Sequence, residues 1–178
     1  MEEKKSTLLK STMTYGAIVG ISLVIYTAIL YLIGQHNSKW LGSFSYVVIV
    51  AGLFFSIKTY RDKELNGSIS YKDAVLTGIL TSVFAAIIIG FFTYIMVRFI
   101  DPSMIDKALE EARQQILDKG VPESQVDMQM KMMEKIISPF VMFLSQTMAF
   151  SIGGAIFSLI IAAFLKKEPA FNPNSDQH

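Results

Sequence analysis

Residues 74–97 read AVLTGILTSVFAAIIIGFFTYIMV, a run of 24 positions without a single Asp, Glu, Lys or Arg. Three further windows share this property, with 24, 18 and 27 residues: Ser11–Gly34, Trp40–Ile57 and Pro139–Leu165. A surface helix of a soluble fold carries charges on its solvent face, and these windows carry none. At 1.5 Å per residue, a helix of this length reaches roughly 36 Å, enough to cross a hydrocarbon core of about 30 Å. The sequence therefore predicts an all-α, polytopic membrane protein.

The borders of the windows predict where each membrane helix begins and ends. The shortest window can lengthen through residues 58–63, whose Lys and Arg side chains reach the headgroups. Asn66-Gly67 then predicts a helix end, and Ser70 with Asp73 forms a capping box for the next helix. We expect the lipid bilayer as partner and one membrane domain (1–178), with four transmembrane helices at about residues 12–34, 40–60, 72–98 and 139–165.

Basic residues near the ends of the spans predict the orientation. Three lysines precede the first span, Lys166-Lys167 follows the last, and four basic residues form an inner-leaflet cluster between spans two and three: Lys58, Arg61, Lys63 and Lys72. Because cytoplasmic loops are enriched in Lys and Arg, we expect both termini in the cytoplasm and residues 167–178 as a disordered cytoplasmic tail. The segment from residue 98 to 139 opposes this assignment, with six basic residues beside eight acidic ones.

That segment, residues 99–138, is the only sizeable polar region, and its pattern is helical. Asp101-Pro102 is typical of a helix start, with Asp as N-cap and Pro at the first position. One apolar stripe follows at helical spacing, and a second appears beyond Gly120 and before a break at Ser138-Pro139. The first stripe is Ile105, Leu109, Ala112 and Ile116, and the second is Val126, Met130, Met133 and Ile137.

Two amphipathic helices joined by a short turn are expected to pack stripe against stripe. We therefore predict an extracytoplasmic helical hairpin over 99–138 that extends spans three and four. The alternative is that both helices lie flat on the outer leaflet with their stripes in lipid. Acidic residues on the polar faces, such as Glu110 and Asp127, disfavour that alternative.

Small residues within the spans predict how the helices pack, because they let backbones approach closely. Span three carries them four residues apart, span one has a Gly-x-x-x-Gly motif, and span four offers two small faces. The expected packing residues are Gly16, Gly20, Ala74, Gly78, Ser82, Ala86, Gly90, Gly153 and Gly154. Close packing within one chain is the first interpretation, and a homo-oligomer interface that uses one face of span four is the second.

Several chemistries are missing from the sequence. There is no cysteine, the only histidines are His36 and His178, and the net charge is +1, so disulfides, multi-histidine zinc sites and nucleic-acid binding are not expected. Phosphate-binding loops, nucleophile elbows and zinc-protease motifs are absent. No Asp, Glu, His, Lys or Arg lies in any window, which disfavours a coupled transporter. We expect no enzyme activity and no cofactor.

A methionine-rich run is the one pattern that suggests a metal. Met128, Met130, Met132 and Met133 offer thioether sulfur, a soft ligand suited to Cu(I). On a helix, however, Met128 and Met132 share one face while Met130 and Met133 share another, so the four cannot converge on one ion. Methionine is also a good helix former and gap filler. We therefore expect no metal.

Several motifs in order resemble a bacterial membrane family, domain of unknown function 4199. They are residues 66–74 (NGSISYKDA) before Gly78, the junction from Tyr94 to Phe99-Ile-Asp-Pro102, Gly120, and Ser138-Pro139 before the last span. The resemblance covers roughly residues 10–166. It implies a multi-pass protein of the bacterial inner membrane with similar topology, and it implies no activity or functional residue.

Three functional hypotheses remain from the sequence. The first is a non-catalytic membrane protein whose 99–138 hairpin binds a protein partner or regulates one. The second is a small oligomeric channel or uncoupled transporter lined by the Ser, Thr and Gly faces of spans three and four. The third is anionic-lipid binding by the inner basic cluster.

Overall fold

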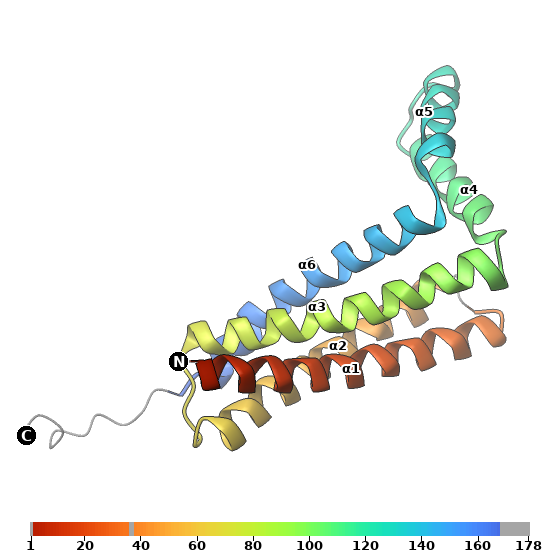
Figure 1. Cartoon of the computed structure of the whole chain (residues 1–178). Coiled ribbons are helices and arrows are strands. Elements are labelled where there is room, and N and C mark those ends of the chain that lie inside the picture. The colour runs from red at the N-terminus through yellow and green to blue at the C-terminus, as the bar shows by residue number, and fades with distance from the viewer. Residues whose placement is uncertain (1, 36–37, 168–178) are drawn as a thin grey trace, which may run out of the picture. The chain divides into compact units, whose positions relative to one another are not determined.

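The computed structural model describes residues 2–35 and 38–167, and its secondary structure there is helical apart from one antiparallel bridge between Ile69 and Lys167 (Figure 1). In chain order the elements are α1 (Glu2–Leu32), α2 (Lys39–Thr59), the π-helical turn η1 (Tyr60–Glu64), α3 (Tyr71–Ile95), the π-helical turn η2 (Met96–Ile100), α4 (Met104–Leu117), α5 (Glu123–Ile136) and α6 (Pro139–Leu165). His36, His178 and the predicted tail beyond Lys167 lie outside the described residues.

Four helical stretches in the described residues are long and apolar enough to cross a membrane: Lys5–Leu32, Trp40–Glu64, Tyr71–Ile100 and Pro139–Leu165. They agree with the four windows, so the all-α fold with four candidate membrane spans is confirmed. The turns η1 and η2 lengthen the second and third spans, and α1 begins well before the predicted residue 12. The chain therefore has the helices of a multi-pass membrane protein.

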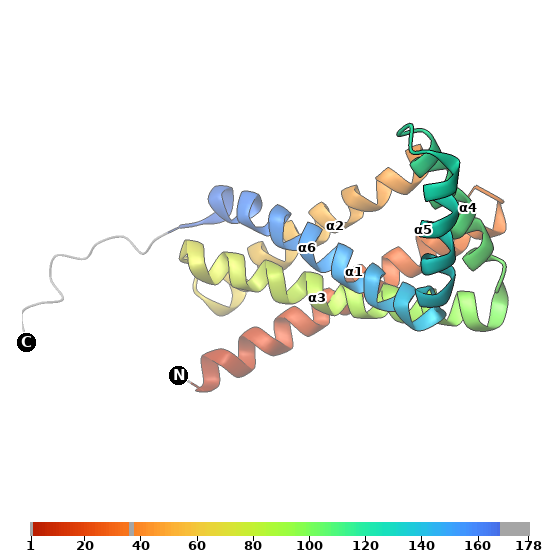
Figure 2. The same cartoon turned by 90° about the horizontal axis from the view of Figure 1, so that it is seen from above.

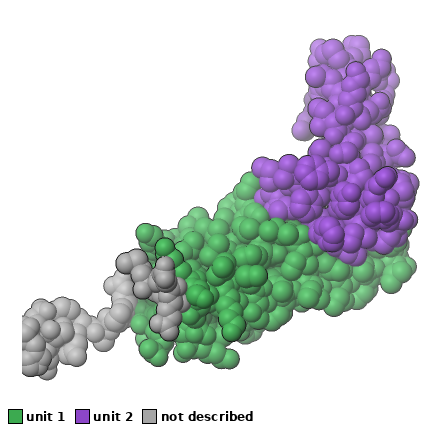
Figure 3. Space-filling view, in the orientation of Figure 1, with its two compact units in different colours: residues 1–88, 149–178 green, residues 89–148 purple. Residues whose placement is uncertain are grey.

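The chain divides into two compact units (Figure 3). The first unit comprises residues 1–88 and 149–178, and thus α1, α2, most of α3 and the second part of α6. The second unit comprises residues 89–148, with the end of α3, η2, α4, α5 and the start of α6.

Within the first unit, α1 crosses α3 where the Gly-x-x-x-Gly motif lies (Figure 2). A Cβ added at Gly16 would lie 2.5 Å from the Cβ of Phe84, and one at Gly20 would lie 2.8 Å from the Cβ of Ile88. Gly52 of α2 is packed equally closely against Val19 of α1. Glycine is needed at these positions because any side chain would push the two helices apart.

The contact between α3 and α6 in the first unit is built from reciprocal small residues. A Cβ at Gly78 would collide with the Ser158 side chain, and a Cβ at Gly154 would collide with the Ser82 side chain. Ala74 and Ala86, on the same stripe of α3, are fully buried. The predicted stripe on span three therefore packs inside the chain.

The turn between α2 and α3 follows the sequence prediction. Asn66 and Gly67 both adopt positive φ, 51° and 83°, which ends the helix. The N–H of Asp73 donates to the Ser70 hydroxyl at 3.1 Å, so Ser70 caps α3. The bridge between Ile69 and Lys167 ties this turn to the end of α6, with N–H···O distances of 2.7 and 3.0 Å.

Within the second unit, both junctions of the hairpin interrupt the helix. Asp101 has extended φ and ψ of −138° and 81°, and α4 begins only at Met104, two residues later than an N-cap at Asp101 predicts. The Asp101 carboxylate accepts the N–H and hydroxyl of Ser103, as an N-cap does from the second residue after it, and residues 102–103 form a turn before α4. Ile137 is extended before Pro139. The hairpin helices α4 and α5 are therefore interrupted from α3 and α6, and they do not continue those helices directly as the sequence predicted.

Candidate functional site

The α4–α5 hairpin is the candidate functional site, because it is an ordered element outside the candidate spans. The predicted stripes face each other. Ile105, Leu109, Ala112 and Ile116 of α4 are all half-buried. On α5, Val126 is 0% exposed, Met130 is 6% exposed and Met133 is half-buried; Ile137, just after α5, is half-buried too. The stripe-against-stripe hairpin is thus present, and its stripes pack against each other.

An ion pair and a glycine turn hold the two helices in register. Arg113 of α4 lies 3.1 Å from the carboxylate of Asp127 and 3.9 Å from that of Glu123, both on α5. Gly120 turns the chain with a φ of 75°, and its N–H donates to the carbonyl of Leu117 at 2.8 Å. The hairpin therefore has its own small core, a cross-helix ion pair and a defined turn.

The outer face of α5 carries an apolar row that sequence reasoning missed. Met128, Met132 and Ile136 recur every fourth residue and are 62%, 61% and 63% exposed. Lys131 and Lys135 lie beside them on the same exposed side of the helix. The four-residue spacing is visible in the sequence, but there Met128 and Met132 were considered only as candidate metal ligands. Below, these five residues are called the outer face of α5.

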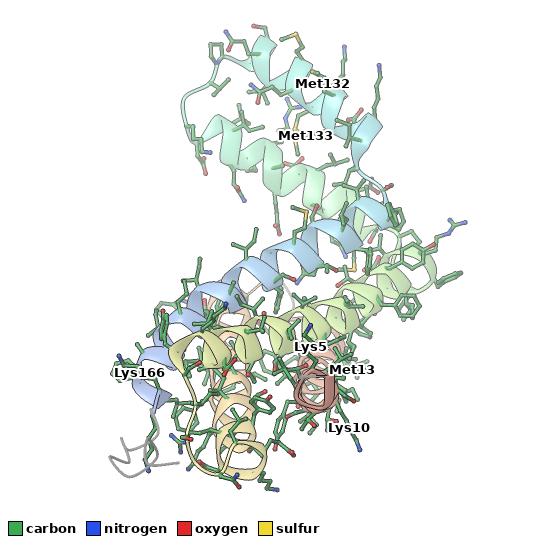
Figure 4. The ribbon with its side chains drawn as sticks, turned by 60° about the vertical axis from the view of Figure 1, so that its left-hand side comes forward. Lys5, Lys10, Met13, Met132, Met133 and Lys166 are labelled. Atoms are coloured by element: carbon green, nitrogen blue, oxygen red, sulfur yellow. The ribbon has the colours of Figure 1, made fainter. Side chains whose placement is uncertain are left out.

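The four methionines do not form a metal site in this arrangement. Figure 4 shows Met133 between α4 and α5 and Met132 on the other side of α5. Met130 is buried and Met133 half-buried on the core side of α5, whereas Met128 and Met132 are exposed. Two sulfurs therefore serve as core packing, and two are presented to the surroundings.

The start of the hairpin holds a small electrostatic cluster. The Asp101 carboxylate accepts hydrogen bonds from Ser103 and from the Lys107 ammonium, the latter at 3.1 Å. These partners stabilise the charged form and lower the pKa of Asp101, with the hydrogen bond from Ser103 as the largest cause. The cluster fixes the turn that starts α4.

The predicted packing residues fall into two groups. Gly16, Gly20, Gly78 and Gly154 lie in helix contacts of the first unit, and Gly90 of the second unit packs against Thr147 and Phe143. Gly153 differs, because a Cβ added there would meet nothing within 4 Å. Its neighbours on the same face of α6, Ser145 and Ala149, are exposed. Only one of the two small faces of α6 is used within the chain.

The four residues of the inner basic cluster make different contacts in the first unit. The Lys58 ammonium lies 5.9 Å from the ring centroid of Phe54. Arg61 pairs with Asp62 at 2.7 Å and donates to the carbonyl of Leu165 at 3.2 Å. Lys63 borders a polar cavity, and Lys72 is exposed in the first turn of α3. The four residues share one end of the unit without forming one site.

Buried hydroxyl groups between α2 and α3 are a feature that the sequence analysis did not single out. Ser56 and Thr81 are fully buried, with their oxygens 2.7 Å apart. Thr81 donates its only hydroxyl proton to the carbonyl of Thr77 at 2.8 Å, so Ser56 is the donor of the bond between the two hydroxyls. In the sequence these hydroxyl residues stand out only because they lie in apolar windows. This does not indicate that Ser56 and Thr81 form a hydrogen bond with each other.

Comparison with known proteins identifies a family and no function. No curated protein and no solved structure matches the chain. The sequence model of one family, described as "Protein of unknown function (DUF4199)", matches residues 14–167, which include all four candidate spans in whole or in large part and the α4–α5 hairpin. The match covers most of the chain and agrees with the resemblance carried by the turn at 66–74 and the hairpin junctions. The protein is therefore a member of the DUF4199 family.

Proposed function

We propose that this protein is a non-catalytic protein of the bacterial inner membrane whose α4–α5 hairpin binds a protein partner outside the cytoplasm. The observation that carries the proposal is the outer face of α5. A stable hairpin that needs Val126 and Met130 for its own core still exposes three large apolar side chains in one row. Exposed apolar rows rimmed by charge are typical of protein interaction sites.

The chemistry of the outer face indicates the kind of partner. Methionine side chains are flexible and adapt to irregular surfaces, and an apolar row at helical spacing suits a groove or a second helix. Lys131 and Lys135 beside the row favour a partner with acidic residues at the rim of its apolar surface. We therefore propose an acidic, helical or groove-forming protein as the partner.

The internal packing of the hairpin supports this proposal over the flat arrangement on the outer leaflet. In the flat arrangement the stripes of α4 and α5 would face lipid. In the structure those stripes contact each other, and the Arg113–Asp127 pair closes one side. Opening the hairpin would expose Val126, which is now 0% exposed, and would break the pair.

The channel hypothesis has no comparable support in residues 2–35 and 38–167. Its expected lining residues on spans three and four are in helix contacts, since Ser82 is 4% exposed and packs against Gly154. Gly153 faces outward, where a pore would require several copies of the chain. We therefore put forward only the interaction function.

Site-specific photocrosslinking in cells tests the proposal. A photoreactive amino acid at Met132 is expected to give one discrete protein adduct, and the change of both Lys131 and Lys135 to Glu is expected to reduce it at least tenfold. The matched control position is Gln115, which is exposed on α4 outside this face. No adduct at Met132, or equal adducts at both positions, would refute the interaction function.

A further inference from the structure

A polar cavity lies in the first unit, at the end of the unit that holds the beginning of α1. Towards its N-terminus, α1 moves away from α3 beyond the crossing at Gly16 and Gly20 (Figure 2). The first turns of α1 and the end of α2 with η1 then border a cavity of about 500 Å³. Volumes of this order are typical of small-molecule sites.

The cavity is lined by hydroxyl groups and lysines from two helices. Ser6, Ser11 and Thr14 come from α1 and Thr59 from α2, with Lys10 and Lys63 beside them. Ser11 and Thr59 are half-buried, whereas Ser6, Thr14 and both lysines are exposed, so the Ser11 and Thr59 hydroxyls lie deeper than the ammonium groups. Figure 4 shows Lys10 extending outward from α1.

The charge of the lining is positive. Glu64 is its one carboxylate, against two lysines. Neither lysine forms a salt bridge with any other residue in the described part of the chain. Arg61, by contrast, is already paired with Asp62. Two ammonium groups beside several hydroxyls thus remain available to an anion.

We propose that this cavity binds a phosphoryl anion. Lysine binds phosphate as a point charge, and hydroxyl groups add hydrogen bonds to the phosphate oxygens. The cavity lies where two candidate membrane spans end, Lys5–Leu32 and Trp40–Glu64, which is the level of lipid headgroups. The phosphoryl group can come from an anionic phospholipid or from a soluble phosphate compound, and both share this chemistry. The site is independent of the hairpin and of its proposed partner.

Native mass spectrometry of the full-length protein in detergent tests the proposal. The probes are phosphatidylglycerol, zwitterionic phosphatidylcholine and inorganic phosphate. The double variant Lys10→Gln/Lys63→Gln is expected to bind phosphatidylglycerol at least about tenfold more weakly, because the ammonium groups proposed to contact the phosphate directly are lost. The matched control is Lys58→Gln/Lys72→Gln, which removes the same charge at the same end outside the cavity and is expected to stay within twofold.

A variant without charge change separates the cavity from general attraction to anions. Ser11→Ala with Thr59→Val keeps every lysine and is expected to weaken phosphatidylglycerol binding at least about threefold, because two hydroxyl donors are lost. Binding that millimolar inorganic phosphate displaces indicates a soluble phosphate compound, and binding that resists it indicates the lipid; either result supports the site. Equal loss in the two lysine pairs, no effect of the hydroxyl changes, or equal affinity for phosphatidylcholine would overturn the proposal.

Discussion

Two neighbouring glycines of α6 show how a single position decides between contact and open surface. Gly154 packs against Ser82 of α3, so that a methyl group there would collide with its side chain, while a methyl group on Gly153 would meet nothing within 4 Å. The sequence presents the two as equal members of small-residue faces. Their difference depends on which side of α6 faces α3, and this direction is a property of the packed bundle.

The pair gives a matched test of this packing. Gly154→Ala is expected to destabilise the protein by about 1–3 kcal/mol, because overpacking forces α3 and α6 apart. Gly153→Ala is expected to be neutral or stabilising, since alanine favours helix by up to about 1 kcal/mol over glycine. Thermal unfolding in detergent measures both. Equal destabilisation would show that the Gly153 face is also packed, as in a homo-oligomer.

The buried hydroxyl pair of Ser56 and Thr81 provides a second test at this scale. A double-mutant cycle with Ser56→Ala and Thr81→Ala is expected to give a coupling of about 0.6 kcal/mol, the average for hydrogen bonds between membrane helices. Ser22 is the control, because its hydroxyl donates to its own helix at the carbonyl of Ile18. Ser22→Ala with Thr81→Ala is expected to show no coupling. A zero value for the first pair would exclude the hydrogen bond.

At the scale of elements, the turn before α4 links charge to folding. Ser103 and Lys107 stabilise the charged carboxylate of Asp101 and lower its pKa. A lowered pKa in the folded state means that the turn is stabilised above the ordinary Asp pKa of about 3.9. That stabilisation is lost as the pH falls through the lower, folded-state pKa.

Carbon-13 NMR titration of the Asp101 carboxyl group measures this shift. We expect a midpoint below about 3.9 that rises towards it in Ser103→Ala and, by a smaller amount, in Lys107→Gln. The order follows from the Ser103 hydrogen bond being the larger cause. A midpoint at the ordinary value in the unaltered protein, or the reverse order of the variants, would contradict the described turn.

Much of the element structure was predictable, because local chemistry determines it. Charge-free windows fixed the spans, Asn66-Gly67 and Ser70 fixed the turn before α3, and apolar spacing fixed the hairpin core. The cap bond from Asp101 to the second residue after it is present, but α4 begins two residues later than the prediction, at Met104. Which helices pack against each other could not be predicted from the sequence. The outer face of α5 and the polar cavity both depend on this packing, so neither was predicted.

At the scale of the whole molecule, the orientation in the membrane follows from a small difference in basic residues. Nine of the 16 lie in the flanks expected inside: three within residues 4–10, four within residues 58–72, and two after α6. The remaining seven lie in the segments expected outside. Because cytoplasmic flanks are enriched in Lys and Arg, the majority predicts both termini in the cytoplasm and the hairpin outside.

The absence of cysteine from the sequence allows a direct measurement of this orientation. Single variants Lys119→Cys at the hairpin turn and Lys72→Cys at the start of α3 place one thiol at each exposed position. A membrane-impermeant maleimide is expected to label Lys119→Cys in intact spheroplasts and Lys72→Cys only after permeabilisation. The reverse pattern would invert the topology and place the hairpin in the cytoplasm. Equal labelling of both before permeabilisation would mean that Tyr71–Ile100 does not cross the membrane. This stretch is the one candidate span between residues 72 and 119, so it must cross the membrane if the two residues lie on opposite sides.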